Sequence, residues 1–134
     1  MSSPSSVRYL TADELWAMND GILQQTGGYA ILGDRGALEA AAMRPQTLAY
    51  CEGADLVTQA AALITGIALN HAFLDGNKRT AAIAGAIFLD LNGWRLAYEG
   101  DEYGRELEAF VMAHDREAAR SAFVAWLRTH LVPR

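Results

Sequence analysis

The sequence is poor in cysteine and in positive charge, and it lacks a long apolar run. A single cysteine, Cys51, excludes an internal disulfide framework and a cysteine-rich zinc site, and its unpaired thiol fits a reducing compartment such as the cytoplasm. Lys and Arg number 11 against 16 Asp and Glu, so the formal net charge is −5. This balance gives no chain-wide basic footprint for nucleic acid, and no apolar run reaches the roughly 20 residues of a membrane span. We therefore expect neither direct nucleic-acid binding nor membrane insertion.

The composition is that of one folded domain. The chain has 134 residues, of which 51% are hydrophobic and 20% charged, enough to build a core in a single domain. The polar start, residues 1–6, lacks the apolar segment of a secretory signal and predicts a short disordered tail. We place the domain at 7–131 and a C-terminal tail at 132–134. Leu131 to Arg134 has the form of a thrombin-site remnant, either vector-derived or native.

Two helices are expected in the first third of the chain. Thr11 and Glu14 form a capping box, and the glycine-rich segment at 26–33 ends the helix that follows. Asp34 is a good N-cap for a short helix to about Met43, which we expect Pro45 to end. The segment at 26–33 itself predicts a mobile loop or a short hairpin.

Two further helices are apolar nearly all round. One is expected at 56–70, after the N-cap Asp55, and the other at 77–91, before the C-cap signal Asn92-Gly93. A helix with apolar residues on every face is buried rather than amphipathic. These two helices are therefore predicted to form the centre of the domain.

The remaining third completes an all-α pattern. Residues 94–98 predict a short extended piece, and Asp101 and Asp115 are N-cap candidates for two more helices. No run alternates with a period of two residues, as a half-buried strand would. We expect an all-α, single-domain bundle of about six helices with two buried central helices.

Titratable and cationic residues gather between the two central helices. His71, Asp75, Asn77, Lys78 and Arg79 fall in one short connection at the centre of the expected core. Burying such groups is costly unless they are paired or bind something. The connection therefore predicts a site rather than a plain turn.

The residue types indicate a phosphate site. Gly76 permits a backbone that aims successive N–H groups at one point, where a helix begins and favours an anion. Lys78 and Arg79 add cations, and Asp75 supplies an oxygen ligand of the kind that Mg²⁺ takes beside phosphates. Histidines gain and lose protons near neutral pH, so His71 could remove a proton from an attacking hydroxyl.

Each residue also has a plainer interpretation. His71 could be a satisfied core histidine, Asp75 a helix cap, and Asn77 a turn residue. Lys78 and Arg79 could form a solvated first turn, although cations are mildly unfavourable at a helix N-terminus. The clustering of all five favours the site.

The connection resembles the signature of the Fic/Doc family. The pattern is His71-x-Phe73-x-Asp75-Gly76-Asn77-x-Arg79, and Lys78 fits the death-on-curing branch, the Doc-type toxins, where other Fic proteins have Gly. Stretches at 33–39, 44–45 and 88–94 are also similar to that branch. The resemblance covers roughly residues 7–131.

The resemblance implies a fold, a reaction and partners. The fold is a small helical bundle, and the reaction transfers a phosphate-containing group from a nucleotide to a protein hydroxyl. The Doc branch uses Mg²⁺ and ATP to phosphorylate a threonine of elongation factor Tu, and a cognate antitoxin neutralises it through a C-terminal segment that folds on binding. The implied roles are His71 as general base, Asp75 as magnesium ligand, Phe73 as inward anchor, and Gly76, Asn77, Lys78 and Arg79 as phosphate cradle, Arg79 also being catalytic.

The sequence departs from the AMP-transferring pattern of the family. That pattern has a second arginine where this chain has Ala82, and the family's self-inhibitory pattern has no match here. We therefore expect a kinase inhibited by a separate chain. AMP transfer to protein and a catalytically silent nucleotide- or partner-binding module remain the alternatives. The segment at 26–33 is either a plain connection or the flap that the family places against its target's backbone.

Overall fold

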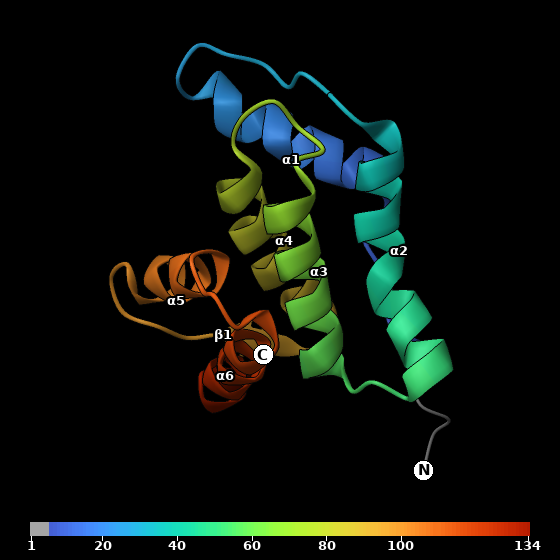
Figure 1. Cartoon of the computed structure of the whole chain (residues 1–134), viewed down its shortest axis with the longest axis vertical. Helices are drawn as coiled ribbons and strands as arrows, with labels where there is room; N and C mark the ends of the chain where they lie inside the picture. The colour runs from blue at the N-terminus through green and yellow to red at the C-terminus, as the bar shows by residue number, and fades with distance from the viewer. Residues whose placement is uncertain (1–5) are drawn as a thin grey trace.

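Six helices and one small sheet make up the protein. The computed structural model describes residues 6–134, so the expected tail at 1–6 lies, except for Ser6, outside the described residues. Figure 1 shows the helices as one bundle, with α3 and α4 in the middle. The elements are α1 Ala12–Gln24, α2 Arg35–Glu52, α3 Leu56–Asn70, α4 Asn77–Leu91, β1 Trp94–Leu96, α5 Glu102–Val111, α6 Arg116–Thr129 and β2 Leu131–Pro133. The predicted all-α class and the number of helices are confirmed.

Side-chain caps fix the start of four helices. The Thr11 hydroxyl accepts a hydrogen bond from the Glu14 N–H at 3.1 Å, and the Glu14 carboxylate accepts one from the Thr11 N–H at 2.8 Å. The carboxylates of Asp34, Asp55 and Asp115 cap α2, α3 and α6 in the same way. The predicted caps are thus confirmed, whereas Asp101 precedes α5 without a side-chain cap bond.

Helix α2 is longer than the sequence predicts. It continues past Met43 and through Pro45 to Glu52, so the expected end at Pro45 is wrong. Proline within a helix removes one backbone hydrogen bond, here the one to the carbonyl of Ala41. Pro45 and Ala41 are both buried, and burial of this face compensates for the lost bond. The helix ends instead at Gly53, whose φ of 65° is the left-handed conformation common at helix ends.

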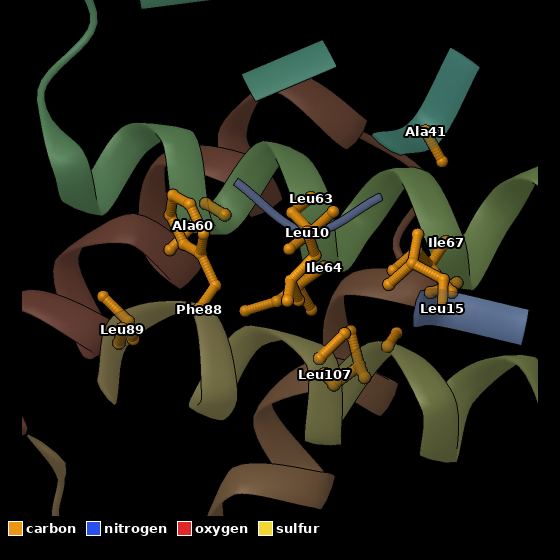
Figure 2. Close-up of a cluster of buried hydrophobic side chains, with 14 of the residues drawn as sticks. Leu10, Leu15, Ala41, Ala60, Leu63, Ile64, Ile67, Phe88, Leu89 and Leu107 are labelled. Atoms are coloured by element: carbon orange, nitrogen blue, oxygen red, sulfur yellow. The ribbon is translucent and has the colours of Figure 1, made fainter. Parts of the chain in front are cut away.

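The hydrophobic core is built around α3 and α4. Figure 2 shows side chains of α3 facing those of α4, with Leu10 of the N-terminal segment and Leu15 of α1 beside them. Burying one large aliphatic or aromatic side chain contributes about 1.5–3 kcal/mol. The core side chains labelled in the figure are Leu10, Leu15, Ala41, Ala60, Leu63, Ile64, Ile67, Phe88, Leu89 and Leu107. The predicted central position of α3 and α4 is confirmed.

A glycine allows α3 and α4 to pack closely. A Cβ atom at Gly85 of α4 would collide with the side chain of Ile64 of α3 and would lie 2.8 Å from the Tyr103 hydroxyl oxygen. That hydroxyl donates a hydrogen bond of 2.7 Å to the carbonyl of Ala82, and burial raises the pKa of Tyr103. Helix α5 is therefore hydrogen-bonded to α4 close to the contact between Gly85 and Ile64.

The C-terminal residues belong to the folded domain. Strand β2 pairs antiparallel with β1, and Val132 lies opposite Arg95. The Arg134 guanidinium contacts the Asp90 carboxylate at 3.3 Å. We expected residues 132 and 133 in a tail, but they lie in a sheet. They pair with the extended piece predicted at 94–98, whose backbone groups need a partner strand. Within residues 6–134, no helix has both the length and the apolar character needed to cross a membrane.

Candidate active site

His71 ends helix α3 in an unusual backbone conformation. Its φ is 51° and its ψ is 41°, and it is the one non-glycine residue in 6–134 with a positive φ. The left-handed conformation costs roughly 1–2 kcal/mol for such a residue, and strained backbone of this kind occurs often at functional sites. The conformation ends the helix abruptly and leaves the His71 side chain exposed on the connecting loop.

Helix α4 begins without a side-chain cap. Its N-cap is Gly76, with a φ of 77°, and no side chain accepts from the N–H groups of the first turn. The first intrahelical bond runs from the Thr80 N–H to the Gly76 carbonyl at 2.9 Å. The N–H groups before it are therefore directed at solvent, where the helix dipole favours an anion. Gly76 thus adopts the left-handed conformation that glycine permits at a helix start.

The Asp75 carboxylate lies at the same helix start. Its Oδ1 atom accepts a hydrogen bond of 2.7 Å from the N–H of Gly76. The side chain is exposed, which leaves a carboxylate oxygen available to a ligand at the mouth of the helix.

The side chain of Asn77 holds the loop together. Its Oδ1 accepts from the Phe73 N–H at 3.2 Å, and its Nδ2 donates to the Phe73 carbonyl at 2.8 Å. Phe73 is 2% exposed, in agreement with its expected role as an inward anchor. Since both polar atoms of the Asn77 side chain bind Phe73, the side chain has no free polar atom for a nucleotide. The plainer interpretation of Asn77 describes its side chain well.

The segment before α2 runs along the loop. The Leu74 N–H donates to the Ile31 carbonyl at 2.9 Å, and the Gly33 N–H donates to the Ala72 carbonyl at 2.8 Å. An isolated β-bridge joins Leu32 to Phe73. Figure 1 shows this segment and the α3–α4 loop at the same end of the bundle, beside α1. The glycine-rich segment is thus a short extended stretch that lies against the loop.

Sequence reasoning missed Asn19, a buried amide beneath the loop. Asn19 is 0% exposed, and its Nδ2 donates to the Asp75 carbonyl at 2.9 Å and to the Thr80 hydroxyl at 3.0 Å. Its Oδ1 is buried without a hydrogen-bond partner among the described residues. The signal was its position, four residues after Leu15 and three before Ile22 on the apolar face of α1. A polar residue on such a face has a partner to satisfy.

Glycine is required at the helix start for a second reason. A Cβ atom at Gly76 would lie 3.1 Å from Asn19 Nδ2 and 3.3 Å from Leu23 Cδ2. Helix α1 therefore approaches the loop closely, and a Cβ atom at Gly76 would require these two side chains to shift by a few tenths of an ångström. The position of the loop is set by α1 as well as by α3 and α4.

The predicted site residues meet in one cleft. It has a volume of about 420 Å³ and lies where α3 ends and α4 begins. The residues that line it are Ala68, His71, Leu74, Asp75, Gly76, Asn77, Lys78, Arg79 and Val111. Each residue predicted to act in catalysis or nucleotide binding is present. A cleft of this size is typical of a small-molecule site.

The two cations of the cleft differ in their surroundings. Lys78 Nζ lies 2.6 Å from Glu108 Oε1 of α5, and the two side chains are 52% and 48% exposed. An ion pair at this exposure contributes little to stability, so the contact mainly orients Lys78. Arg79 makes no hydrogen bond or ion pair with another side chain in the part of the chain that the structure describes. Its guanidinium group is available to an anion.

The cleft suits a magnesium ion that arrives with a nucleotide. No group of three or more His, Cys, Asp or Glu side chains in residues 6–134 could hold a metal. Asp75 alone supplies a carboxylate beside the helix start. Mg²⁺ in nucleotide sites is held by one or two carboxylates, substrate phosphates and water. The Asp75 carboxylate is therefore a ligand of the kind that Mg²⁺ takes together with phosphates.

Comparison with known proteins gives the family. A sequence profile described as "Fic/DOC family" matches residues 9–89. The chain is 47% identical over 79 residues to "Toxin Doc" of Mycolicibacterium smegmatis, covering 56% of this chain and 59% of that protein. It is 36% identical over 88 residues to "Protein kinase doc" of Escherichia phage P1, covering 65% and 70%. The match thus spans less than two thirds of the mycobacterial protein. The profile includes the whole α3–α4 loop, and the chain belongs to the Fic/Doc family, with similarity to its Doc-type toxins.

Proposed function

We propose that this protein is a Doc-type toxin that transfers the γ-phosphoryl group of Mg-ATP to a protein hydroxyl. The observation that carries the proposal is the uncapped start of α4, which opens into the same cleft as His71, Asp75 and Arg79. The backbone N–H groups and the Arg79 guanidinium bind the phosphates of the nucleotide. Mg²⁺, bound beside Asp75, neutralises phosphate charge.

His71 is the general base of the proposed reaction. Its ring lies in the cleft, and among residues 6–134 no hydrogen bond ties it to another group. A ring nitrogen takes the proton of the acceptor hydroxyl as that oxygen bonds to the γ-phosphorus. The bond from the γ-phosphorus to the β–γ bridging oxygen breaks, and ADP leaves. Positioned proton transfer of this kind typically contributes ~10²–10⁴-fold to the rate.

Two positions favour phosphoryl transfer over AMP transfer. Lys78 adds a cation at the helix start and is oriented by Glu108. Ala82, one turn further along α4, has only a methyl group, and its carbonyl is bound by Tyr103. Which phosphorus meets the hydroxyl depends on how the triphosphate is seated. Lys78 places positive charge at the first turn of α4, and Ala82 places none at the second. This distribution favours binding of the triphosphate with its γ-phosphorus next to His71.

The proposed acceptor is a translation factor. The similarity to the phage protein kinase supports the reaction type, and resemblance to the Doc branch points to a threonine of elongation factor Tu. We further propose that a cognate antitoxin, with a C-terminal segment that folds on binding, blocks the cleft. A segment that folds on binding loses conformational entropy and must bury apolar surface to compensate.

Incubation with γ-labelled ATP and a bacterial lysate tests the proposal. Wild-type protein is expected to label one predominant protein, identified by mass spectrometry as elongation factor Tu, and His71→Ala is expected to label none. Label on a different protein would correct the acceptor. An absence of any label that depends on this chain and on Mg²⁺ would favour the silent binding module instead.

A further inference from the structure

A second cleft lies on the opposite side of α3 from the catalytic cleft. It has a volume of about 480 Å³ and lies against α2, α3 and α6. Two arginines from distant parts of the sequence line it, Arg44 of α2 and Arg120 of α6, together with the side chains of Met43 and Leu69. No aspartate or glutamate lines this cleft, although the chain as a whole carries a net charge of −5.

The two arginines have no acidic partner. Of the ion pairs found within residues 6–134, none includes Arg44 or Arg120. Helix α6 also places Arg116 four residues before Arg120, and both guanidinium carbons lie over the Phe110 ring, at 5.6 and 5.7 Å from its centroid. Like charges four residues apart on a helix repel each other and destabilise the helix. An anionic ligand would remove this repulsion.

Two contacts relate this cleft to the catalytic one. Arg116 donates a hydrogen bond of 3.1 Å to the carbonyl of Val111, and Val111 lines the catalytic cleft. At the end of α3, Asn70 lines the second cleft and the next residue, His71, lines the catalytic cleft. A chain bound in the second cleft therefore has a short path to His71.

We infer that the cleft between Arg44 and Arg120 binds an acidic segment of the protein that receives the phosphoryl group. The inference rests on the proposed function, because it assigns a docking site to that reaction's acceptor. Guanidinium groups pair with carboxylates through two parallel hydrogen bonds, and Met43, 55% exposed, offers carbon contact to the same segment. The nucleotide occupies the catalytic cleft, so the acceptor must be held largely outside it.

An acidic segment fits this cleft better than an inhibitory helix does. An antitoxin segment that folds on binding must bury considerable apolar surface, whereas the two arginines of this cleft favour a segment rich in carboxylates. An acceptor needs only specific and reversible docking, which charge complementarity supplies together with fast association.

A titration followed by NMR tests the docking site without using the transfer reaction. The probes are a short peptide of Glu and Ala, its Gln and Ala counterpart, and sodium phosphate, each added to ¹⁵N-labelled full-length protein. The acidic peptide is expected to shift the amide signals of Thr47, Gly66 and Asn70. The double variant Arg44→Gln/Arg120→Gln is expected to bind it at least about tenfold more weakly, as the loss of one charge-assisted hydrogen bond predicts. The control Arg95→Gln, at an exposed arginine of β1, is expected to bind as wild type.

Three results would overturn the inference. The neutral peptide could bind as well as the acidic one, the double variant could bind as well as wild type, or phosphate alone could give the same shifts at the same concentration. The last result would mark a site for free anions.

Transfer kinetics separate this inference from the proposed function. The double variant is expected to raise KM for the protein acceptor about tenfold and to leave KM for ATP and kcat unchanged. An unchanged KM for the acceptor, with peptide binding lost, would assign the cleft to another partner and overturn the inference. A wild-type protein that transfers nothing would overturn the proposed function, while the peptide titration would still decide whether the cleft binds acidic chains.

Discussion

Along the α3–α4 pair, the contact at mid-helix is made by carbon atoms, whereas the loop at one end is held by hydrogen bonds. At mid-helix, the side chain of Ile64 occupies the space that a Cβ atom at Gly85 would take. At the loop, Asn77 binds the backbone of Phe73, and Asn19 binds the backbone of Asp75. The first contact fixes the distance between the helices, and the second fixes the path of the chain between them.

The difference explains how an apolar bundle carries a polar site. Apolar contacts are non-directional and tolerate small shifts, while hydrogen bonds specify the positions of individual atoms. The position of the loop therefore depends on a small number of hydrogen bonds. The backbone at His71 is also strained, because this residue has the left-handed conformation. Substitutions at the loop should alter activity more than stability, and substitutions at mid-helix should do the reverse.

The largest effect is expected at His71. His71→Ala removes the proposed proton acceptor from an exposed position, so transfer should fall by ~10²–10⁴-fold with no loss of thermal stability. Asp75→Ala should also abolish transfer, because it removes the carboxylate beside the phosphates. The control is His114→Ala, at an exposed histidine between α5 and α6. Growth arrest on expression measures activity in cells, and His71→Ala that arrests growth as wild type does would refute the mechanism.

Substitution of Asn19 should affect both stability and activity, because this buried side chain also holds the loop. Asn19→Leu removes the donor to the Asp75 carbonyl, and the resulting shift of the loop should lower kcat by about tenfold to hundredfold. The matched control is Gln59→Leu, which removes another buried amide, one that bonds Tyr9 and the Ala54 carbonyl. Each variant should lose about 1–3 kcal/mol of unfolding free energy. If Asn19→Leu and Gln59→Leu lost kcat equally, Asn19 would contribute only to stability and not to the position of the loop.

Gly85 should show the opposite behaviour. Gly85→Ala adds a methyl group that collides with Ile64, and such overpacking typically costs about 1–3 kcal/mol. Gly104→Ala, at a helical glycine with open space around it, should instead stabilise the protein by about 0.5–1 kcal/mol. Urea unfolding measures both changes. We expect folded Gly85→Ala to keep more activity than Asn19→Leu. An equal loss of kcat in the two variants would contradict the separation of the two regions.

The smallest effect concerns the far end of α3. The Thr58 N–H and Arg128 lower the pKa of Asp55 to about 2, so its carboxylate stabilises the fold above the ordinary aspartate pKa, and this contribution is lost as pH falls to about 2. The side chain is half exposed, so we expect less than about 1 kcal/mol after solvent screening. The stability difference between wild type and Asp55→Asn should shrink from pH 5 to pH 2. A difference independent of pH would show that charge is not involved.

The sequence predicts most of the fold because its local signals are strong. Thr11, Asp55 and Asp115 begin helices where their capping patterns indicate, and the apolar surfaces of α3 and α4 identify the centre. The end of α2 is wrong because burial of the face around Pro45 outweighs one missing hydrogen bond, and that balance depends on tertiary packing. The pairing of β1 with the chain's end also depends on contacts far apart in sequence.

The site is predictable as a set of residues but not as a geometry. The short segment from His71 to Arg79 brings its members together whatever the fold does elsewhere. The contacts that orient them come from other helices, as with Glu108 beside Lys78 and Asn19 beside Asp75. Local patterns contain no information on these pairings, because the residues are 30 and 56 positions apart.

Parallel reactions with α-labelled and γ-labelled ATP test most directly whether the start of α4 seats the γ-phosphorus next to His71. Both reactions use the same wild-type protein, Mg²⁺ and acceptor, so that only the position of the label differs. The account predicts label on the acceptor from γ-labelled ATP alone. Label from α-labelled ATP would show AMP transfer and contradict the seating inferred from Lys78 and Ala82.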